Sequence, residues 1–176
     1  MLKLSTRIAT LNDISALVEL HERNVSKNEF SMLLSSSLRY LFYKICILAN
    51  HTSIYVLIKN EKLIGFSIVS TDHILLSKQY KNQAIFKMTF YLLGLLVNRK
   101  FKKLIAILAF IFERNVTKIP NDIVANCVEM TILDKKYRIN TDCIIAFFKM
   151  YKKNVDYLRT CGTGKIWASA SLDNKA

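Results

Sequence analysis

The residues around position 140 have the types and order of an anion-binding helix start. Arg138 stands just before a helical stretch that opens with Asn140, Thr141 and Asp142. The first N–H groups of a helix lack intrahelical partners and the helix dipole is positive there, so a pyrophosphate binds well at that end. Arg138 and the hydroxyl of Thr141 would support such a ligand, whereas the charge of Asp142 would oppose it. The alternative for Arg138 is a solvated residue of the first helical turn.

Other side chains of chemical interest are isolated in the sequence. The histidines, His21, His51 and His73, have no paired carboxylate nearby and are expected to be structural or on the surface. The four cysteines show no CxxC spacing, which argues against a structural zinc or any other metal and against disulfides. Cys143 lies at the helix start, where a thiolate is favoured, and its alternative is apolar filling.

Composition predicts one folded domain spanning residues 1–176. Of these residues 52% are hydrophobic, and only 4 are Gly and 1 is Pro. The net charge of +13 favours an anionic partner. No nucleic-acid-binding signature accompanies this charge, which argues against nucleic acid. The N-terminus lacks the apolar core of an export signal, so we expect a cytoplasmic protein.

Hydrophobic periodicity predicts alternating strands and helices in the first half of the chain. We expect a strand over 4–9, a helix capped by Thr10 or Asn12 with Asp13 in its first turn, and a second helix over about 29–49. Two apolar runs, 53–59 and 63–70, read as a β-hairpin around Asn60-Glu61-Lys62.

The second half is predicted to begin with a helical pair, inserted at about 77–118. Its apolar segments, 83–97 and 101–112, are separated by the basic residues Arg99 and Lys100. A strand over 125–133, a helix over 140–158 and a further strand over 165–171 follow. The fold class is therefore mixed α/β, with the helical pair between the third and fourth strands.

This order and the segment Val128–Arg138 together resemble the GNAT superfamily of N-acetyltransferases. The Ile64-Gly65-Phe66 segment is similar to the family's central strands, and Leu172-Asp173-Asn174-Lys175-Ala176 is similar to the element after its fifth strand. The long helical pair resembles a bacterial subgroup that acylates amino sugars for surface polysaccharides. The resemblance implies a single GNAT-like domain that uses acetyl-CoA or another acyl-CoA as co-substrate.

The resemblance also implies roles for particular residues. Glu129 would take a proton, often through water, from the amine that attacks the thioester. The alternative for Glu129 is a strand residue that keeps its strand soluble. The CoA-binding set would be Leu133, Arg138, Ile139, Asn140, Thr141, Asp142 and Cys143.

Two departures from the family pattern bear on activity. Thr141 and Cys143 replace the two glycines whose missing Cβ lets phosphate approach the backbone, so we expect these side chains to crowd the ligand. No residue after Ala176 supplies the family's C-terminal Tyr, which commonly protonates the CoA thiolate. From this we expect either a fragment, without the strands that close the sheet, or a chain that has given up part of the chemistry.

The helical pair suggests a second class of function. Neither apolar segment reaches the roughly 20 residues that span a bilayer. Aromatic residues beside Lys and Arg could lie on an anionic membrane, making the protein peripheral to it, or could be buried within the domain or a homodimer.

The function predicted from the sequence is acyl transfer from CoA, or from an acyl carrier, to a primary amine of a small molecule, such as an amino sugar. The alternative is a catalytically inactive GNAT-like protein that binds a partner or a membrane surface.

Overall fold

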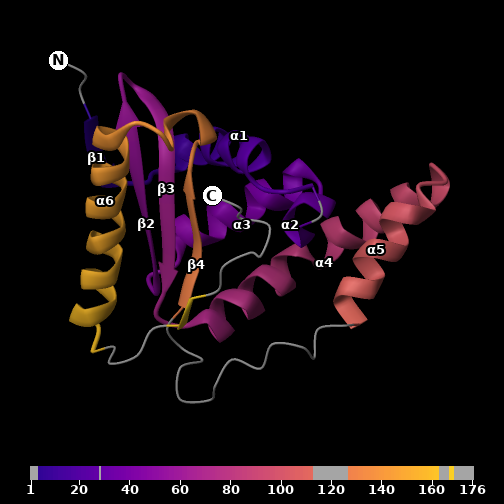
Figure 1. Cartoon of the computed structure of the whole chain (residues 1–176). Coiled ribbons are helices and arrows are strands. Elements are labelled where there is room, and N and C mark those ends of the chain that lie inside the picture. The colour runs from indigo at the N-terminus through magenta and orange to yellow at the C-terminus, as the bar shows by residue number, and fades with distance from the viewer. Residues whose placement is uncertain (1–3, 28, 113–126, 163–166, 169–176) are drawn as a thin grey trace.

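The fold is described by a computed structural model for residues 4–27, 29–112, 127–162 and 167–168 (Figure 1). In chain order the elements are β1 (Leu4–Ile8), the 3-10 turn η1 (Leu11–Asp13), α1 (Ile14–Asn24), α2 (Phe30–Leu33), α3 (Ser36–Leu48), β2 (Thr52–Lys59), β3 (Lys62–Ser70), α4 (His73–Val97), α5 (Phe101–Phe112), β4 (Cys127–Leu133), the 3-10 turn η2 (Lys135–Tyr137), α6 (Thr141–Thr160) and β5 (Trp167–Ala168). The predicted α/β class and the helical pair between the third and fourth strands are confirmed.

The strands form a single sheet in the order β1-β2-β3-β4-β5. Neighbouring strands are antiparallel except for β4 and β5, which are parallel and pair Cys127 with Trp167 and Val128 with Ala168. Parts of the two strands predicted over 125–133 and 165–171 therefore lie side by side over these two pairs. The other residues of the predicted strand 165–171 lie outside the described part of the chain.

Helices cover both faces of the sheet. The helix α6 lies against one face, and α1 and α3 lie against the other (Figure 1). Neighbouring residues of β2 point to opposite faces, as expected for a strand. Val56 therefore joins the core under α1 and α3, and Leu57 joins the core under α6 with Met150.

A capping arrangement fixes the start of the first helical segment. Thr10 is the N-cap of η1, and its backbone N–H donates to the carboxylate of Asp13 at 2.7 Å. The guanidinium of Arg7 in β1 also donates to both oxygens of Asp13, at 2.6 and 2.7 Å. These bonds lower the pKa of Asp13 to about 2, the Arg7 bond being the largest cause. The predicted helix start with Asp13 in the first turn is confirmed.

The continuous helix predicted over 29–49 is wrong. The structure has two helices, α2 and α3, because Leu34 and Ser35 are extended between them. The hydroxyl of Ser35 accepts from the N–H of Leu38 and caps α3. Serine competes for backbone hydrogen bonds and favours caps over helix interiors, so the run of three serines at 35–37 was a signal for a break.

Two turns rely on left-handed backbone conformations. Asn60 and Glu61, between β2 and β3, both have positive φ, which is the type I′ geometry that matches the twist of a hairpin. Arg99 also has a positive φ of 53° between α4 and α5. Its N–H donates to the carbonyl of Leu96, and the N–H of Lys100 donates to that of Leu95, which together form a Schellman motif. The inserted helical pair begins at His73, four residues before the predicted boundary.

Gly65 lies where β3, β4 and α6 come closest. A Cβ at this position would lie 3.1 Å from the carbonyl oxygen of Ile132 and 3.2 Å from the ring of Phe147. The glycine therefore allows α6 to pack closely on the sheet beside the end of β4.

Candidate functional site: the end of β4 and the start of α6

A β-bulge places Glu129 apart from the regular ladder of the sheet. Ile68 of β3 pairs with Met130, and its neighbour Val69 pairs with Val128, so Glu129 has no partner on β3. Bulges of this kind re-aim a residue and are common beside active sites. The backbone of Glu129 therefore lies at an irregular point of β4, and its side chain is outside the described part of the structure.

The edge of β4 that faces β5 carries the parallel pairing only at Cys127 and Val128 within the described residues. Within the described part of the chain, the residues from Met130 to Leu133 pair with β3 only. Backbone N–H and C=O groups on such an edge can bind an extended amide-containing ligand, as an additional strand would.

The turn after β4 is held by backbone and side-chain hydrogen bonds. The N–H of Asp134 donates to the carbonyl of Ile64 at 2.8 Å, and its carboxylate lies 3.4 Å from the guanidinium of Arg23 in α1. The Nε of Arg138 donates to the carbonyl of Leu133 at 3.2 Å. This bond fixes the exposed Arg138 side chain next to the end of β4.

Asn140 is the N-cap of α6. Its side-chain oxygen accepts from the N–H of Cys143 at 3.0 Å. The first N–H groups of a helix have no intrahelical partner, so the N–H groups of Thr141 and Asp142 remain for a ligand. Both of these residues are exposed. The start of α6 thus retains part of the predicted phosphate-binding geometry, with the acidic side chain of Asp142 beside it.

Cys143 is buried in the core, whereas Ile139 is exposed to solvent. The thiol of Cys143 is fully buried with Leu57, Ile64 and Leu133, so it fills the core under α6 and does not crowd the surface of the turn. A ligand at this turn could contact Cys143 only through its backbone. Ile139, in contrast, is 92% exposed and leaves a bare apolar side chain beside Asn140.

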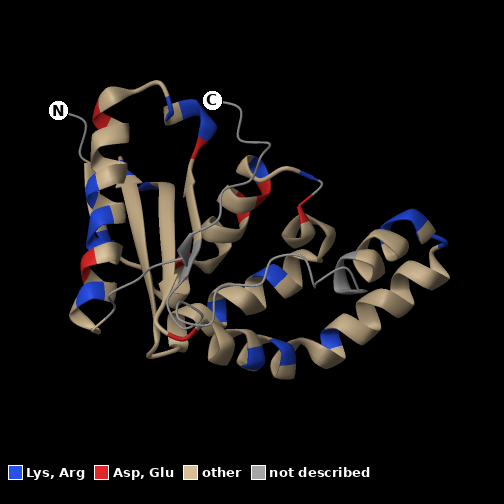
Figure 2. Cartoon of the chain, turned by 60° about the horizontal axis from the view of Figure 1, so that its bottom comes forward, with Lys and Arg blue, Asp and Glu red and all other residues tan. Residues whose placement is uncertain are grey.

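A groove of about 630 Å³ runs between α6 and the β1–β2 edge of the sheet. Asn140 and Asp142 lie at one end of it, and Lys59, Lys149 and Lys153 contribute positive charge along its length. Figure 2 shows the basic bands along α6. A groove with three lysines next to a helix N-terminus suits an anionic ligand.

A smaller cavity of about 220 Å³ lies on the other face of the sheet, under α1–α4. It reaches Met130, the neighbour of Glu129 in β4, and its other walls are mainly aromatic and aliphatic. Met130 accepts a weak hydrogen bond from the hydroxyl of Tyr43, with an O–S distance of 3.7 Å. The cavity is therefore a small space that lies beside the β4 bulge.

The polar wall of this cavity is a chain of buried hydrogen bonds. Nδ1 of His21 is 2.8 Å from the hydroxyl of Tyr43, and Nε2 is 2.8 Å from that of Ser31. Burial, followed by the charge of Arg39, lowers the pKa of His21 to about 4, so the ring is neutral at pH 7. Nε of Arg39 is buried and has no hydrogen-bond partner among the described residues.

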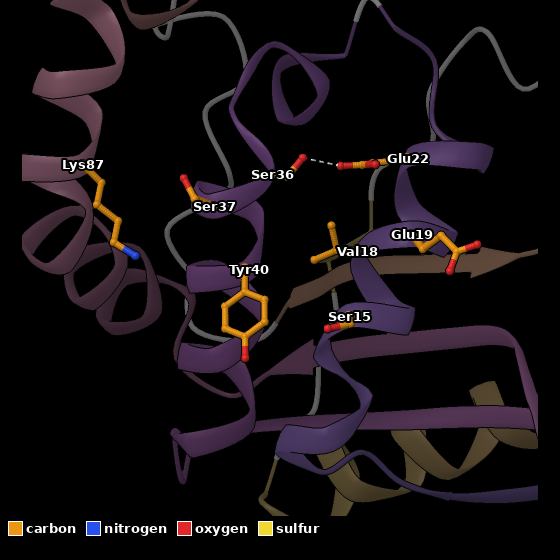
Figure 3. Close-up of a pocket in the computed structure, with 8 residues that line it drawn as sticks. All are labelled: Ser15, Val18, Glu19, Glu22, Ser36, Ser37, Tyr40 and Lys87. Carbon is orange, nitrogen blue, oxygen red and sulfur yellow. Dashed lines mark hydrogen bonds between the residues drawn. The ribbon is translucent and has the colours of Figure 1, made fainter. Parts of the chain in front are cut away.

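A third hollow, of about 500 Å³, lies among α1, α3 and α4 (Figure 3). Glu22 and Lys87 project toward it from different helices. The carboxylate of Glu22 accepts from Ser36 at 2.8 Å and from Arg39 at 2.6 Å, and these bonds lower its pKa. This hollow shares no residue with β4 or α6, and the partly exposed carboxylate of Glu22 already has its donors.

The structure brings together part of what the sequence predicted. Leu133 ends β4, and the residues from Arg138 to Cys143 follow η2 and lead into the first turn of α6. Sequence reasoning missed Tyr43 and Arg39 as cavity residues, because both lie in apolar helical patterns with no distinguishing spacing. No group of three or more His, Cys, Asp or Glu residues in the described ranges could hold a metal ion.

Solved structures similar to this chain include aminoglycoside 6'-N-acetyltransferases and a predicted acetyltransferase. The aminoglycoside 6'-N-acetyltransferase AAC(6')-Ih from Acinetobacter baumannii superposes with a TM-score of 0.54 at 9% identity, over 98% of this chain and 83% of that one. AAC(6')-Iy, in complex with the bisubstrate analogue CoA-S-monomethyl-acetylneamine, gives 0.53 at 9%, over 98% and 82%. A predicted acetyltransferase from Clostridium acetobutylicum, with acetyl-CoA, gives 0.53 at 11%, over 98% and 84%.

These likenesses show that the chain has the GNAT acetyltransferase fold. No protein-family model and no curated protein sequence matches it.

Proposed function

We propose that this chain is an N-acyltransferase that moves an acetyl or other acyl group from CoA to a primary amine. The observation that carries the proposal is the combination at β4: a parallel β4–β5 pair, a bulge at Glu129 and a turn that leads into the capped start of α6. Structural neighbours with the same fold hold acetyl-CoA or a CoA bisubstrate analogue, which supports acyl-CoA as the co-substrate.

In this proposal the turn holds the pyrophosphate and β4 positions the thioester. Arg138 and the N–H groups of Thr141 and Asp142 would bind the phosphates. The open edge of β4 would accept the pantetheine amides as a strand accepts its neighbour. Lys59, Lys149 and Lys153 would raise the local concentration of the anionic co-substrate.

The chemical step needs a proton acceptor. Amines are mostly protonated at neutral pH, so the nucleophile must first lose a proton, which Glu129 would accept directly or through water. The nitrogen then bonds to the thioester carbonyl carbon, the C–S bond breaks, and the thiolate leaves with the electron pair. The second proton of the attacking nitrogen passes to solvent or to the departing thiolate, because Glu129 already holds the first.

The acceptor would enter from the face that carries α1 and α3. The cavity beside Met130 lies on this face, next to the bulge, and contains His21, Ser31 and Tyr43 as polar groups. Its size suits a small amine, and an amino sugar is the acceptor class we propose. The neighbour AAC(6')-Ih is named as an aminoglycoside 6'-N-acetyltransferase, which supports a small amine as the substrate.

The second candidate is a catalytically inactive protein with the same fold. The charge of Asp142 at the phosphate position favours it, and so does the use of the Cys143 N–H by the Asn140 cap. In that case the chain would retain the fold for binding a partner or a surface.

An acyl-transfer assay separates the two candidates. Purified protein is given acetyl-CoA and a panel of hexosamines, and free thiol and acetylated product are measured. We expect product from the parent and a loss of at least 100-fold in kcat for Glu129→Gln, within the usual range for removal of a general base. Glu61→Gln, at the exposed hairpin turn, is the matched control and should keep full activity.

Absence of product with every amine would contradict the proposal and favour the inactive protein. Full activity of Glu129→Gln with product formation would keep the acyltransferase but remove Glu129 as its base.

A further inference from the structure

The hairpin of α4 and α5 extends away from the sheet (Figures 1 and 2). One side of α4 packs on the body of the protein through Ala84, Met88, Tyr91 and Leu95, which recur at helical spacing. At its far end α5 turns back along α4. Within the described ranges no helix is both long and apolar enough to cross a membrane.

The other side of α4 is also apolar, although it faces outward. Phe86, Phe90, Leu93 and Val97 recur at intervals of four, three and four residues, so they form one stripe opposite the packed side. Three of them are highly exposed: Phe86 by 76%, Phe90 by 74% and Val97 by 79%. Scattered exposed apolar residues are normal, but a continuous aromatic stripe marks an interaction surface.

The helix α5 continues this pattern. Phe101, Ile105 and Leu108 are exposed at intervals of four and three residues, which places them on one face of α5. Ile107, in contrast, is fully buried. Both helices of the hairpin therefore carry an outward apolar stripe in addition to a packed face.

The charges of the hairpin are of one sign only. Residues 73–112 contain seven Lys or Arg and no Asp or Glu: Lys78, Lys81, Lys87, Arg99, Lys100, Lys102 and Lys103. Figure 2 shows blue bands on α4 and at the α4–α5 turn, with no red between them. On a helical wheel Lys78 and Lys87 flank the apolar stripe of α4 rather than interrupt it, and Lys102 flanks that of α5.

We propose that the α4–α5 hairpin lies in the interface of an anionic lipid bilayer. The apolar stripes would enter the boundary between headgroups and acyl chains, and the flanking lysines would contact anionic headgroups. A second copy of the chain is a poorer occupant, because two surfaces that carry seven positive charges and no negative ones would repel each other.

The proposal is tested by sedimentation of the full chain with phosphatidylcholine vesicles, with and without phosphatidylglycerol. We expect binding to the anionic vesicles at low salt, and weaker binding at about 0.5 M salt, where the Debye length is only a few Å. Arg99→Gln/Lys100→Gln/Lys102→Gln should lower partitioning about 100-fold, at about 1 kcal/mol per cation. Phe90→Gln/Val97→Gln should lower it at least about tenfold through loss of buried apolar area.

Two matched controls separate the hairpin from overall charge and apolarity. Lys149→Gln/Lys152→Gln/Lys153→Gln changes three exposed lysines of α6, removes the same charge and should leave vesicle binding nearly unchanged. Phe148→Gln removes an exposed aromatic from the same helix and should also have little effect.

Three results would overturn the proposal. The first is a parent protein that does not sediment with anionic vesicles at low salt. The second is a loss of binding in the α6 variants as large as that in the hairpin variants. A concentration-dependent dimer that Phe90→Gln/Val97→Gln converts to monomer would identify a second copy as the occupant. None of these results depends on whether the chain transfers an acyl group.

Discussion

His21 is a buried residue of the cavity, and its protonation state affects the stability of the protein. Both of its ring nitrogens have hydroxyl partners, Tyr43 and Ser31, and a neutral ring suits that arrangement because it has one donor and one acceptor. The periodicity of α1 placed His21 on the same face as Leu17 and Val18, which are also buried, so its structural position was predictable. Its partners in α2 and α3 were not, because no sequence spacing links helices that meet only in the fold.

The lowered pKa of His21 predicts a specific loss of stability in acid. A group whose pKa is depressed by folding contributes its full stability above the unfolded value of 6.5 and loses it as pH falls toward about 4. Between those pH values we expect the free energy of unfolding to fall by about 2–3 kcal/mol from this group alone. Denaturant titrations of the parent and His21→Gln at pH 7.5 and pH 4.5 measure it.

In these titrations the variant should lose less stability than the parent over the same pH interval. An equal loss in both proteins would show that protonation of His21 does not oppose folding.

At the scale of elements, local signals predicted most of the helices and strands. Alternating apolar residues identified β2 and β3, and the polar Asn60-Glu61-Lys62 located their turn. The sequence failed at 34–35, where a continuous apolar periodicity concealed the serine cap of α3. Apolar filling, the alternative given for Cys143, matches its burial, but the expectation that its side chain crowds the ligand is wrong, since the direction of the first turn of α6 depends on its packing against β2 and β3.

The turn between α4 and α5 provides a prediction at this scale. Arg99 occupies the left-handed position of the Schellman motif, which disfavours residues with a Cβ. Arg99→Gly should therefore stabilise the protein by roughly 0.5–1 kcal/mol, net of the greater freedom of glycine in the unfolded chain. Thermal unfolding followed by circular dichroism measures the change.

Lys44→Gly, at an exposed position inside α3, is a useful opposite control, because a helical position should lose stability with glycine. Destabilisation by Arg99→Gly would contradict the conformational explanation of this turn.

The whole molecule combines two features on one GNAT fold. The proposed transfer site lies where β4 ends and α6 begins, and the apolar, basic hairpin is inserted between β3 and β4 in the chain. The fold itself could be predicted from the order of elements. Whether the CoA site is blocked could not be predicted. The sequence shows that the glycines are replaced, but it does not show where the replacing side chains point. The structure places Thr141 and Asp142 on the surface and Cys143 in the core.

Binding of acetyl-CoA is the central claim, and isothermal calorimetry measures it most directly. Arg138→Ala should weaken binding about tenfold or more, since a charge-assisted bond to phosphate contributes roughly 1.5–3 kcal/mol. Asp142→Asn should strengthen binding by removing a repelling charge. Arg159→Ala removes the same side chain from the other end of α6 and should have no effect. We predict saturable binding by the parent, with higher affinity for Asp142→Asn and lower affinity for Arg138→Ala. No measurable heat from the parent or from Asp142→Asn would contradict a CoA site at this turn.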